Sequence, residues 1–323
     1  MYQFALFDPR PQGVEANDKV FADPVYGIEV TVPALAKRCA FNLDPQHSGG
    51  DANRAAIEDA LMTELPAEGS TLATVRADLD AVGSMAIFNL RAKGESLESA
   101  MERIALVVAA DKFARGGYSG PKRLPTRSNP WDESSATAES SRPLATIAAA
   151  IMDFKVPLAG RVSTMEKWLL TGEEPKQYRD FVEKERLDMI TALETGQIKV
   201  KVVEVTGAEE GLDHEDPFCT HPHVRTIAVV ESTHRAATSV GYSLAPVVVA
   251  VNPAFKQGPS EPYKKFTICQ FAGGFADIKS ALVELATLET GWGGSPTIGG
   301  SPQGVNSTLT VEQVVEVVAR HLK

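Results

Sequence analysis

An apolar run over residues 71–77 leads directly into the sequence Asp78-Leu79-Asp80-Ala81-Val82-Gly83-Ser84. The run predicts a strand, and Gly83 and Ser84 are expected to open a helix over residues 84–91. A strand, an acidic turn and a helix in this order are typical of an open α/β sheet, where ligands bind at the carboxyl ends of the strands. Asp78 and Asp80 are therefore expected at a ligand-binding edge.

Two carboxylates at positions i and i+2 can be aimed by the turn at one hard cation or at two neighbouring ones. The alternative is that Asp80 or Ser84 only caps the following helix, because short polar side chains satisfy the free backbone N–H groups of a first turn. The spacing of Asp78 and Asp80 by itself is compatible with both interpretations.

The same segment resembles the first motif of the DHH phosphoesterases, whose pattern is roughly H-x-x-P-D-x-D-A-x-G-S. The matching positions are Asp78, Asp80, Ala81, Gly83 and Ser84, whereas Thr74 and Ala77 stand at the family's histidine and proline. The resemblance implies a two-domain α/β enzyme that binds manganese through His and Asp. It also implies that a metal-bound water hydrolyses phosphodiester or phosphoanhydride bonds.

Further ligands are expected near this edge. His47, in Asp44-Pro45-Gln46-His47, follows another apolar stretch and could approach the same sheet edge, with Asp44 as a ligand or an orienting residue. The family's second motif, an aspartate that ends the next strand, has a counterpart in Asp111, after the apolar run 104–110. The expected cofactor is a divalent metal, Mn²⁺ with Mg²⁺ or Zn²⁺ as alternatives, and the expected catalytic and metal-binding residues are His47, Asp78, Asp80 and Asp111.

The D-H-H triplet that names the family is absent from the sequence. The stretch where it would fall, residues 112–130, carries basic side chains instead, namely Lys112, Arg115, Lys122, Arg123 and Arg127. Guanidinium and ammonium groups could hold an anionic substrate directly. A site with one metal, or with none, is therefore also compatible with the sequence.

Two repeats of the G-G-S-P type lie within residues 291–304. Glycine lets successive backbone N–H groups point inward and form a nest for phosphate or carboxylate oxygens. A surface loop of turn residues is the alternative. In the DHH phosphoesterases a glycine-rich G-G-G-H-type signature of the C-terminal domain contacts substrate phosphate, and the resemblance implies the same for this segment. The expected contacts are Gly293, Gly294, Ser295, Thr297, Gly299, Gly300, Ser301 and Gln303.

Two more groups of residues are candidates for substrate binding. The sequence Ser232-Thr233-His234-Arg235 lies between a predicted strand and a predicted helix, where His234 and Arg235 could hold an anion. A plain cap by Ser232 or Thr233 is the alternative. His221 and His223 flank Pro222, so in extended chain both would face one side and contact phosphate.

Those two histidines lie close in the sequence to His214 and Cys219. The four residues do not have the ligand spacing of a zinc site. A loop that happens to be rich in histidine is the alternative to a binding role for them.

Periodicity and turn residues also predict the remaining elements. Helices are predicted over residues 53–65, 96–104, 143–154, 163–170, 175–195, 234–244, 278–288 and 311–322. Strands are predicted over residues 27–32, 40–43, 104–110, 198–205, 226–231, 246–251 and 266–271. Gly196 is expected to stop the long helix over 175–195.

The chain has 323 residues, more than the roughly 150 of one typical domain, so two domains are expected. The predicted architecture is α/β, with a parallel-sheet DHH-like domain over residues 1–196. A smaller mixed α/β domain over residues 197–323 would carry the glycine-rich segment. The active site is expected in the cleft between the two domains.

The formal net charge of −10 argues against a broad nucleic-acid-binding surface, but a small anionic substrate is compatible with local basic clusters. The three cysteines are far apart and odd in number, which favours a reducing compartment. The first ten residues have no basic segment followed by a long apolar one, so no signal peptide is expected, and no run reaches the roughly 18 apolar residues of a membrane span. A cytoplasmic protein is expected, with no membrane partner, and a homo-oligomer is compatible with the sequence.

These features together predict a metal-dependent phosphoesterase that acts on a nucleotide, a short oligonucleotide or another small anionic phosphoester. Two alternatives stay open. One is a metal-free nucleotide-binding or regulatory protein on a DHH-like scaffold. The other is a hydrolase of a small anionic molecule that contains no phosphate.

Overall fold

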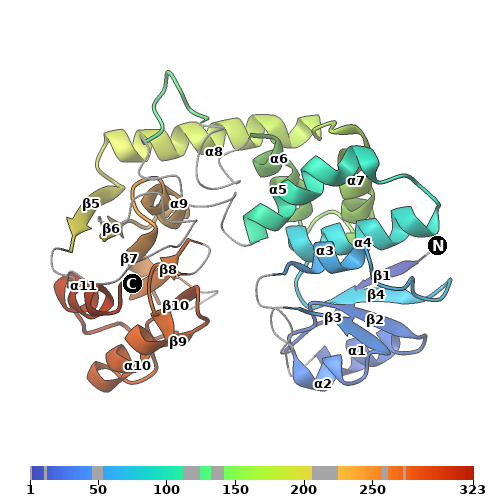
Figure 1. Ribbon diagram of the computed structural model, residues 1–323, viewed down its shortest axis with the longest axis horizontal. Helices are drawn as coiled ribbons and strands as arrows, with labels where there is room; N and C mark the ends of the chain where they lie inside the picture. The colour runs from blue at the N-terminus through green and yellow to red at the C-terminus, as the bar shows by residue number, and fades with distance from the viewer. Residues whose placement is uncertain are drawn as a thin grey trace. The chain divides into compact units, whose positions relative to one another are not determined.

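The computed structural model describes residues 2–10, 13–45, 54–111, 124–131, 142–205, 225–256, 261–271 and 274–323. The chain forms two compact α/β units, and each has its own sheet (Figure 1). The first unit comprises residues 1–112 and 142–183, and the second comprises residues 113–141 and 184–323. The division falls inside helix α8 (Lys176–Glu194), whereas the sequence placed the domain boundary at its end.

The sheet of the first unit has four parallel strands in the order β1-β4-β2-β3. Their bounds are β1 (Gln3–Leu6), β2 (Val25–Ile28), β3 (Phe41–Leu43) and β4 (Thr71–Thr74). Because all four strands are parallel, their carboxyl ends meet at one edge of the sheet. The ligand-binding edge that was predicted after residues 71–77 is therefore the edge at which all four strands end.

Helices cover both faces of this sheet, as parallel sheets require (Figure 1). The short helices α1 (Val14–Val20) and α2 (Pro33–Ala36) lie on one face. The other face carries α3 (Ala56–Ala60) and α4 (Leu79–Ala92), and α4 is buried from Asp80 to Leu90. The helices that surround α4 are α5 (Met101–Asp111), preceded by the short η2 (Glu98–Ala100), α6 (Arg142–Ile151) and α7 (Leu158–Thr171).

The sheet of the second unit has six strands in the order β5-β6-β7-β8-β10-β9. Their bounds are β5 (Lys199–Glu204), β6 (Thr226–Glu231), β7 (Val247–Phe255), β8 (Tyr263–Gln270), β9 (Gly293–Gly294) and β10 (Ile298–Gly300). The pair β6–β7 is parallel and the other pairs are antiparallel. This sheet is mixed, as predicted.

The two faces of the second sheet have separate cores, because alternate residues of a strand point to opposite faces. Val247, Val249 and Val251 pack under α10 (Ile278–Leu288) and α11 (Val311–Arg320). Val248 and Ala250 face the core formed with α9 (Ala237–Tyr242) and the end of α8. None of the helices in the described ranges is long and apolar enough to cross a membrane.

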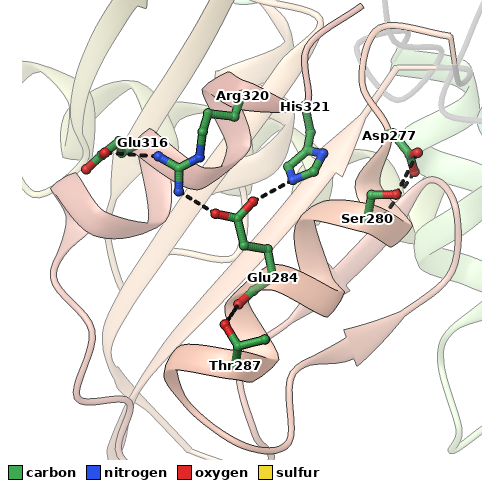
Figure 2. Close-up of polar contacts among 7 residues, drawn as sticks. All are labelled: Asp277, Ser280, Glu284, Thr287, Glu316, Arg320 and His321. Carbon is green, nitrogen blue, oxygen red and sulfur yellow. Dashed lines mark hydrogen bonds and ion pairs between the residues drawn. The ribbon is translucent and has the colours of Figure 1, made fainter.

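Polar contacts join α11 to α10 above this core (Figure 2). The carboxylate of Glu284 on α10 lies between Arg320 and His321. One of its oxygens accepts a hydrogen bond from Arg320, and the other contacts His321 Nε2 at 2.8 Å. Arg320 also donates to Glu316, one turn earlier on α11, at 2.9 Å. The contacts lower the pKa of Glu284. The contacts with Glu284 hold the end of α11 against α10.

Two of the secondary-structure predictions around the acidic motif are wrong. The run 104–110 belongs to helix α5, so Asp111 ends a helix and not a strand. A continuous apolar run does not distinguish a buried strand from a buried helix, and its Ala and Leu residues favour the helix. The helix after β4 begins at Leu79 and not at Ser84, which places Asp80 in its first turn.

Other predictions agree closely with the structure. The strand over 226–231 and the helix over 278–288 have the predicted bounds, and Gly196 follows α8 with a φ of 73°. The helix predicted over 53–65 is limited to α3 in the described residues. The elements β1 and α1 were not predicted.

The glycine-rich segment forms a hairpin in which β9 and β10 are antiparallel, and β10 continues into the sheet beside β8. Close packing explains several of its glycines. A Cβ atom on Gly294 would lie 2.3 Å from Gly299 Cα, and one on Gly299 would lie 2.4 Å from Leu282 Cδ1. At Gly293, by contrast, a Cβ atom would meet nothing within 4 Å.

We therefore expect Gly294→Ala to lower the free energy of unfolding by about 1–3 kcal/mol, because the backbone of Gly299 would have to move. The matched variant Gly293→Ala should stay within about 0.5 kcal/mol of the parent. Urea unfolding followed by circular dichroism measures both. Equal losses in the two variants would contradict the packing described for the hairpin.

Candidate active site

Carboxylates follow the strands of the first unit at the edge where all four strands end. Asp8 follows β1, Glu29 directly follows β2, and Asp44 directly follows β3. Asp78 follows β4, and Asp80 and Asp111 lie on the helices α4 and α5. Glu29 interacts electrostatically with Asp80, Asp78, Asp111 and Asp44. These five residues, Glu29, Asp44, Asp78, Asp80 and Asp111, are called the carboxylate cluster below.

Asp78 is the N-cap of α4. Its carboxylate accepts a hydrogen bond from the backbone N–H of Ala81 at 3.1 Å, and Arg76 Nε lies 3.5 Å from its other oxygen. The capping alternative therefore applies to Asp78, and not to Asp80 or Ser84 as the sequence suggested. The Ser84 hydroxyl instead donates to the Asp80 carbonyl one turn earlier in the helix, at 2.8 Å.

Asp80 joins two helices. Its side chain is 1% exposed, and its two oxygens accept from the backbone N–H groups of Ala56 and Ile57, at 2.7 and 2.8 Å. These N–H groups are the free donors at the start of α3, where a carboxylate is favoured. Burial, and after it the charge of Asp111, raises the pKa of Asp80 to about 8, although the two backbone hydrogen bonds lower it.

The sequence analysis missed Glu29, which has the most unusual environment in the cluster. It is the one described residue other than glycine with a positive φ, 50°, and its backbone N–H donates to Leu43 O at 2.9 Å. Burial, and then repulsion by Asp80, raises the pKa of Glu29 to about 10. The sequence signal was a carboxylate directly after a short apolar strand, as for Asp44. Backbone strain of this kind is common at functional sites.

The structure does not test the metal prediction. The four aspartates of the cluster repel a charged Glu29, and a cation would offset that repulsion. Within the described ranges, however, no group of three or more His, Cys, Asp or Glu side chains is placed to hold a metal ion. Both oxygens of Asp80 are engaged by backbone N–H groups of α3, and His47 lies outside the described residues. The four-residue ligand set therefore stays a prediction.

In the second unit, the predicted substrate contacts of the hairpin have different environments. Ser301 is 3% exposed, and its hydroxyl accepts from Phe266 N at 3.0 Å, so it is engaged within the sheet. Ser295 accepts from Ile298 N at 3.1 Å and lies 3.2 Å from the Thr297 hydroxyl, and both oxygens belong to the turn. Gly293, Gly294 and Gln303 are exposed, and Gly299 and Gly300 are half-buried. The predicted contact with phosphate stays a prediction.

His234 and Arg235 have partners within the second unit. The Ser232 hydroxyl accepts from His234 N at 2.9 Å, and His234 Nδ1 accepts from Ala236 N at 3.1 Å. Arg235 forms an ion pair with Glu185 on α8. Burial lowers the pKa of His234. The cap expected from Ser232 or Thr233 is not found, because α9 begins at Ala237 with Ala236 as its N-cap, and the anion-binding role of His234 and Arg235 stays a prediction.

Several predicted residues lie outside the described residues and have no structural account. They are His47, Lys112, Arg115, Lys122, Arg123, His214, Cys219, His221 and His223. Arg127, the described member of the predicted basic stretch, donates to Glu194 at 3.0 Å and to the Thr191 hydroxyl at 2.9 Å.

Comparisons with known proteins give a limited result. No protein-family model matches the chain. No curated protein matches it in sequence either. Among solved structures, the chain is similar to a pGpG-specific phosphodiesterase, PggH from Vibrio cholerae, with 9% identity and a TM-score of 0.46. The similarity covers 99% of this chain and 98% of that one. At this identity and TM-score the likeness assigns no function.

Asp78 and Asp80 have different contacts, so replacing each of them with Asn should lower the free energy of unfolding by different amounts. Asp80→Asn should lower the free energy of unfolding by about 1–3 kcal/mol, because the amide nitrogen cannot accept and one N–H of α3 loses its partner. Asp78→Asn should change it by less than about 0.5 kcal/mol, since Asn and Asp are comparable N-caps. Urea unfolding of both variants at one pH measures this difference, and a larger loss for Asp78→Asn would contradict the assigned contacts.

The raised pKa of Glu29 predicts that the free energy of unfolding depends on pH. Its pKa rises from 4.5 to about 10 on folding, so the folded state holds a proton that the unfolded state loses between these values. The contribution of protonated Glu29 to the free energy of unfolding is therefore complete below pH 4.5 and decreases as the pH rises toward 10. Glu29→Gln, which does not titrate, should unfold with a shallower decrease between about pH 5 and 9 when a chelator is present. Glu15→Gln, at an exposed position of α1, should keep the slope of the parent, and an unchanged slope in Glu29→Gln would contradict the prediction.

Proposed function

We propose that the protein hydrolyses a phosphoester bond of a nucleotide, a short oligonucleotide or another small anionic phosphoester. The observation that carries this proposal is the carboxylate cluster at the edge where four parallel strands end. Such edges are the ligand-binding positions of open α/β sheets. Groups with strongly raised pKa values that gather at one edge are also typical of sites with catalytic proton transfer.

The cluster offers the groups that ester hydrolysis needs. A carboxyl group that stays protonated near neutral pH can donate a proton to a leaving group, and an ionised one can take a proton from water. Glu29, whose pKa is raised to about 10, suits the first role. Asp78, which is about one-third exposed at the start of α4, is the more accessible group for the second.

A divalent cation is part of the proposal, with Mn²⁺ as the first choice and Mg²⁺ or Zn²⁺ as alternatives. It would be held by Asp78, Asp80 and Asp111, with His47 as the fourth predicted ligand. When bound, such a cation lowers the pKa of a coordinated water and polarises the phosphoryl group. It would also offset the repulsion between this cluster and an anionic substrate.

A metal-free anion-binding protein is the second candidate, and specific contacts favour it. The residue at the histidine position of the resembled motif is Thr74, whose hydroxyl is hydrogen-bonded to the backbone of Arg76. The Asp80 carboxylate is engaged by α3. In such a protein the cluster would stay protonated in part, and the chain would bind a nucleotide without hydrolysing it.

The experiment that separates the candidates combines metal analysis with an activity screen of the full chain. We expect bound divalent metal in protein purified without chelator, and Mn²⁺-dependent hydrolysis of a nucleotide, a dinucleotide or a generic phosphodiester. Asp78→Asn, which keeps the helix cap, should lower kcat/KM by at least about 100-fold. Asp18→Asn, at an exposed position of α1, is the matched control and should keep full activity.

The opposite outcomes are also informative. Nucleotide binding without bound metal and without turnover would contradict hydrolysis and support the metal-free candidate. Turnover of a small carboxylic ester but of no phosphoester would favour the third interpretation, hydrolysis of an anionic molecule without phosphate.

A further inference from the structure

Two arginines follow neighbouring strands at the edge that carries the carboxylate cluster. Arg10 follows β1 and Arg76 follows β4, and the two strands pair in parallel from Gln3↔Thr71 to Leu6↔Thr74. The pairing continues beyond the strand ends, because Phe7 N donates to Thr74 O at 2.8 Å. The two arginines therefore follow neighbouring strands at one edge of the sheet.

Arg10 is held in place by a chain of contacts that begins in the core. Asn17 on α1 is 5% exposed, and its side chain contacts both the N–H and the carbonyl of Asp8, at 2.9 and 2.7 Å. The Asp8 carboxylate in turn accepts from Arg10 Nε and Nη2, both at 2.7 Å. An exposed ion pair contributes little to stability by itself. Here Asp8 engages one N–H donor on Nε and one on Nη2, which leaves three N–H donors of Arg10 for another acceptor.

Arg76 is fixed through its backbone and exposed through its side chain. The hydroxyl of the fully buried Thr74 accepts from Arg76 N at 3.2 Å and donates to Arg76 O at 3.0 Å. The Arg76 side chain is 78% exposed, and its closest acidic partner is Asp78 at 3.5 Å. Among the described residues its guanidinium has no hydrogen-bond acceptor at normal distance. The Nε of the guanidinium lies next to Asp78, and the donors on its two Nη atoms can face a ligand.

We propose that Arg10 and Arg76 form an anion-binding site that holds a phosphate group of the substrate beside the carboxylate cluster. This inference deepens the proposed function and rests on it. The ionised carboxylates of the cluster repel a phosphoester, and positive groups at the same edge would offset that repulsion. Guanidinium groups bind phosphate oxygens in pairs of parallel hydrogen bonds, which lysine does not do.

Another exposed arginine of the same unit provides the comparison. Arg38 pairs with Asp18 at 2.7 Å, and its guanidinium also lies over the ring of Phe21, 4.0 Å from the centroid. It follows α2, on the connection that leads away from the carboxyl end of β2 and into β3. Arg38 therefore precedes β3, at the edge opposite the strand ends that carry the cluster, and its guanidinium is covered by an aromatic ring, so it serves as the matched control.

The test measures the binding of pyrophosphate to the full chain by isothermal titration calorimetry. Arg10→Gln and Arg76→Gln should each raise the Kd about tenfold, and the double variant should raise it further, because charged hydrogen bonds to the anion are lost. Arg76→Lys should be intermediate, since it keeps the charge but not the paired donors. Arg38→Gln should bind as the parent does, and thermal melting checks that every variant is folded.

Two results would overturn the inference: a parent protein that binds no pyrophosphate at millimolar concentration, or a double variant that binds it as the parent does. Measuring phosphoester turnover tests the proposed function separately from the arginine site. If the parent hydrolyses a phosphoester and the double variant has an unchanged KM, the function stands and the arginine site fails. If the parent hydrolyses none but binds pyrophosphate through both arginines, the site stands and the hydrolase fails.

Discussion

The carboxylate of Asp80 lies almost fully buried between α3 and α4 and accepts the first backbone N–H groups of α3. This contact fixes the start of α3 to the helix that follows β4, at the edge where all four strands end. It places a carboxyl group in the core, which is costly unless hydrogen bonds or a neighbouring positive group compensate it. The start of α3 supplies that compensation, and the position of the other carboxylates follows from the same edge of the sheet.

This edge holds more acidic groups than can be ionised together. Burial and mutual repulsion raise the pKa of Glu29 and Asp80, so protons, a metal cation or guanidinium groups must balance the charge. The two proposals made for this protein are two forms of that balance. In one of them a divalent cation joins the cluster. In the other, Arg10 and Arg76 offset the charge at the neighbouring strand ends, and the two are compatible with each other.

The second unit shows how a glycine-rich segment can have a structural reason independent of any ligand. Gln270 at the end of β8 is 2% exposed, and its amide donates to Ala276 O and Pro296 O at 3.0 and 2.8 Å. Glu289 at the end of α10 accepts from the Trp292 ring at 2.8 Å and from the Ser307 hydroxyl at 2.8 Å. These two side chains hold the hairpin at its turn and at its base. Gly294 and Gly299 are then required because the two strands and α10 approach closely.

Local patterns in the sequence were sufficient for elements whose pattern belongs to one kind of structure. The apolar strand over 226–231, the helix over 278–288 and the stop at Gly196 follow from periodicity and from the backbone freedom of glycine. The acidic motif after β4 likewise predicted a sheet edge with carboxylates. What the tertiary structure decided was the role of each group: Asp78 caps its own helix, Asp80 binds another, and Glu29 joins them from a strand about 50 residues earlier. Pairings between distant segments, and the burial that shifts a pKa, arise only when the sheet forms, so the residues next to each carboxylate do not contain them.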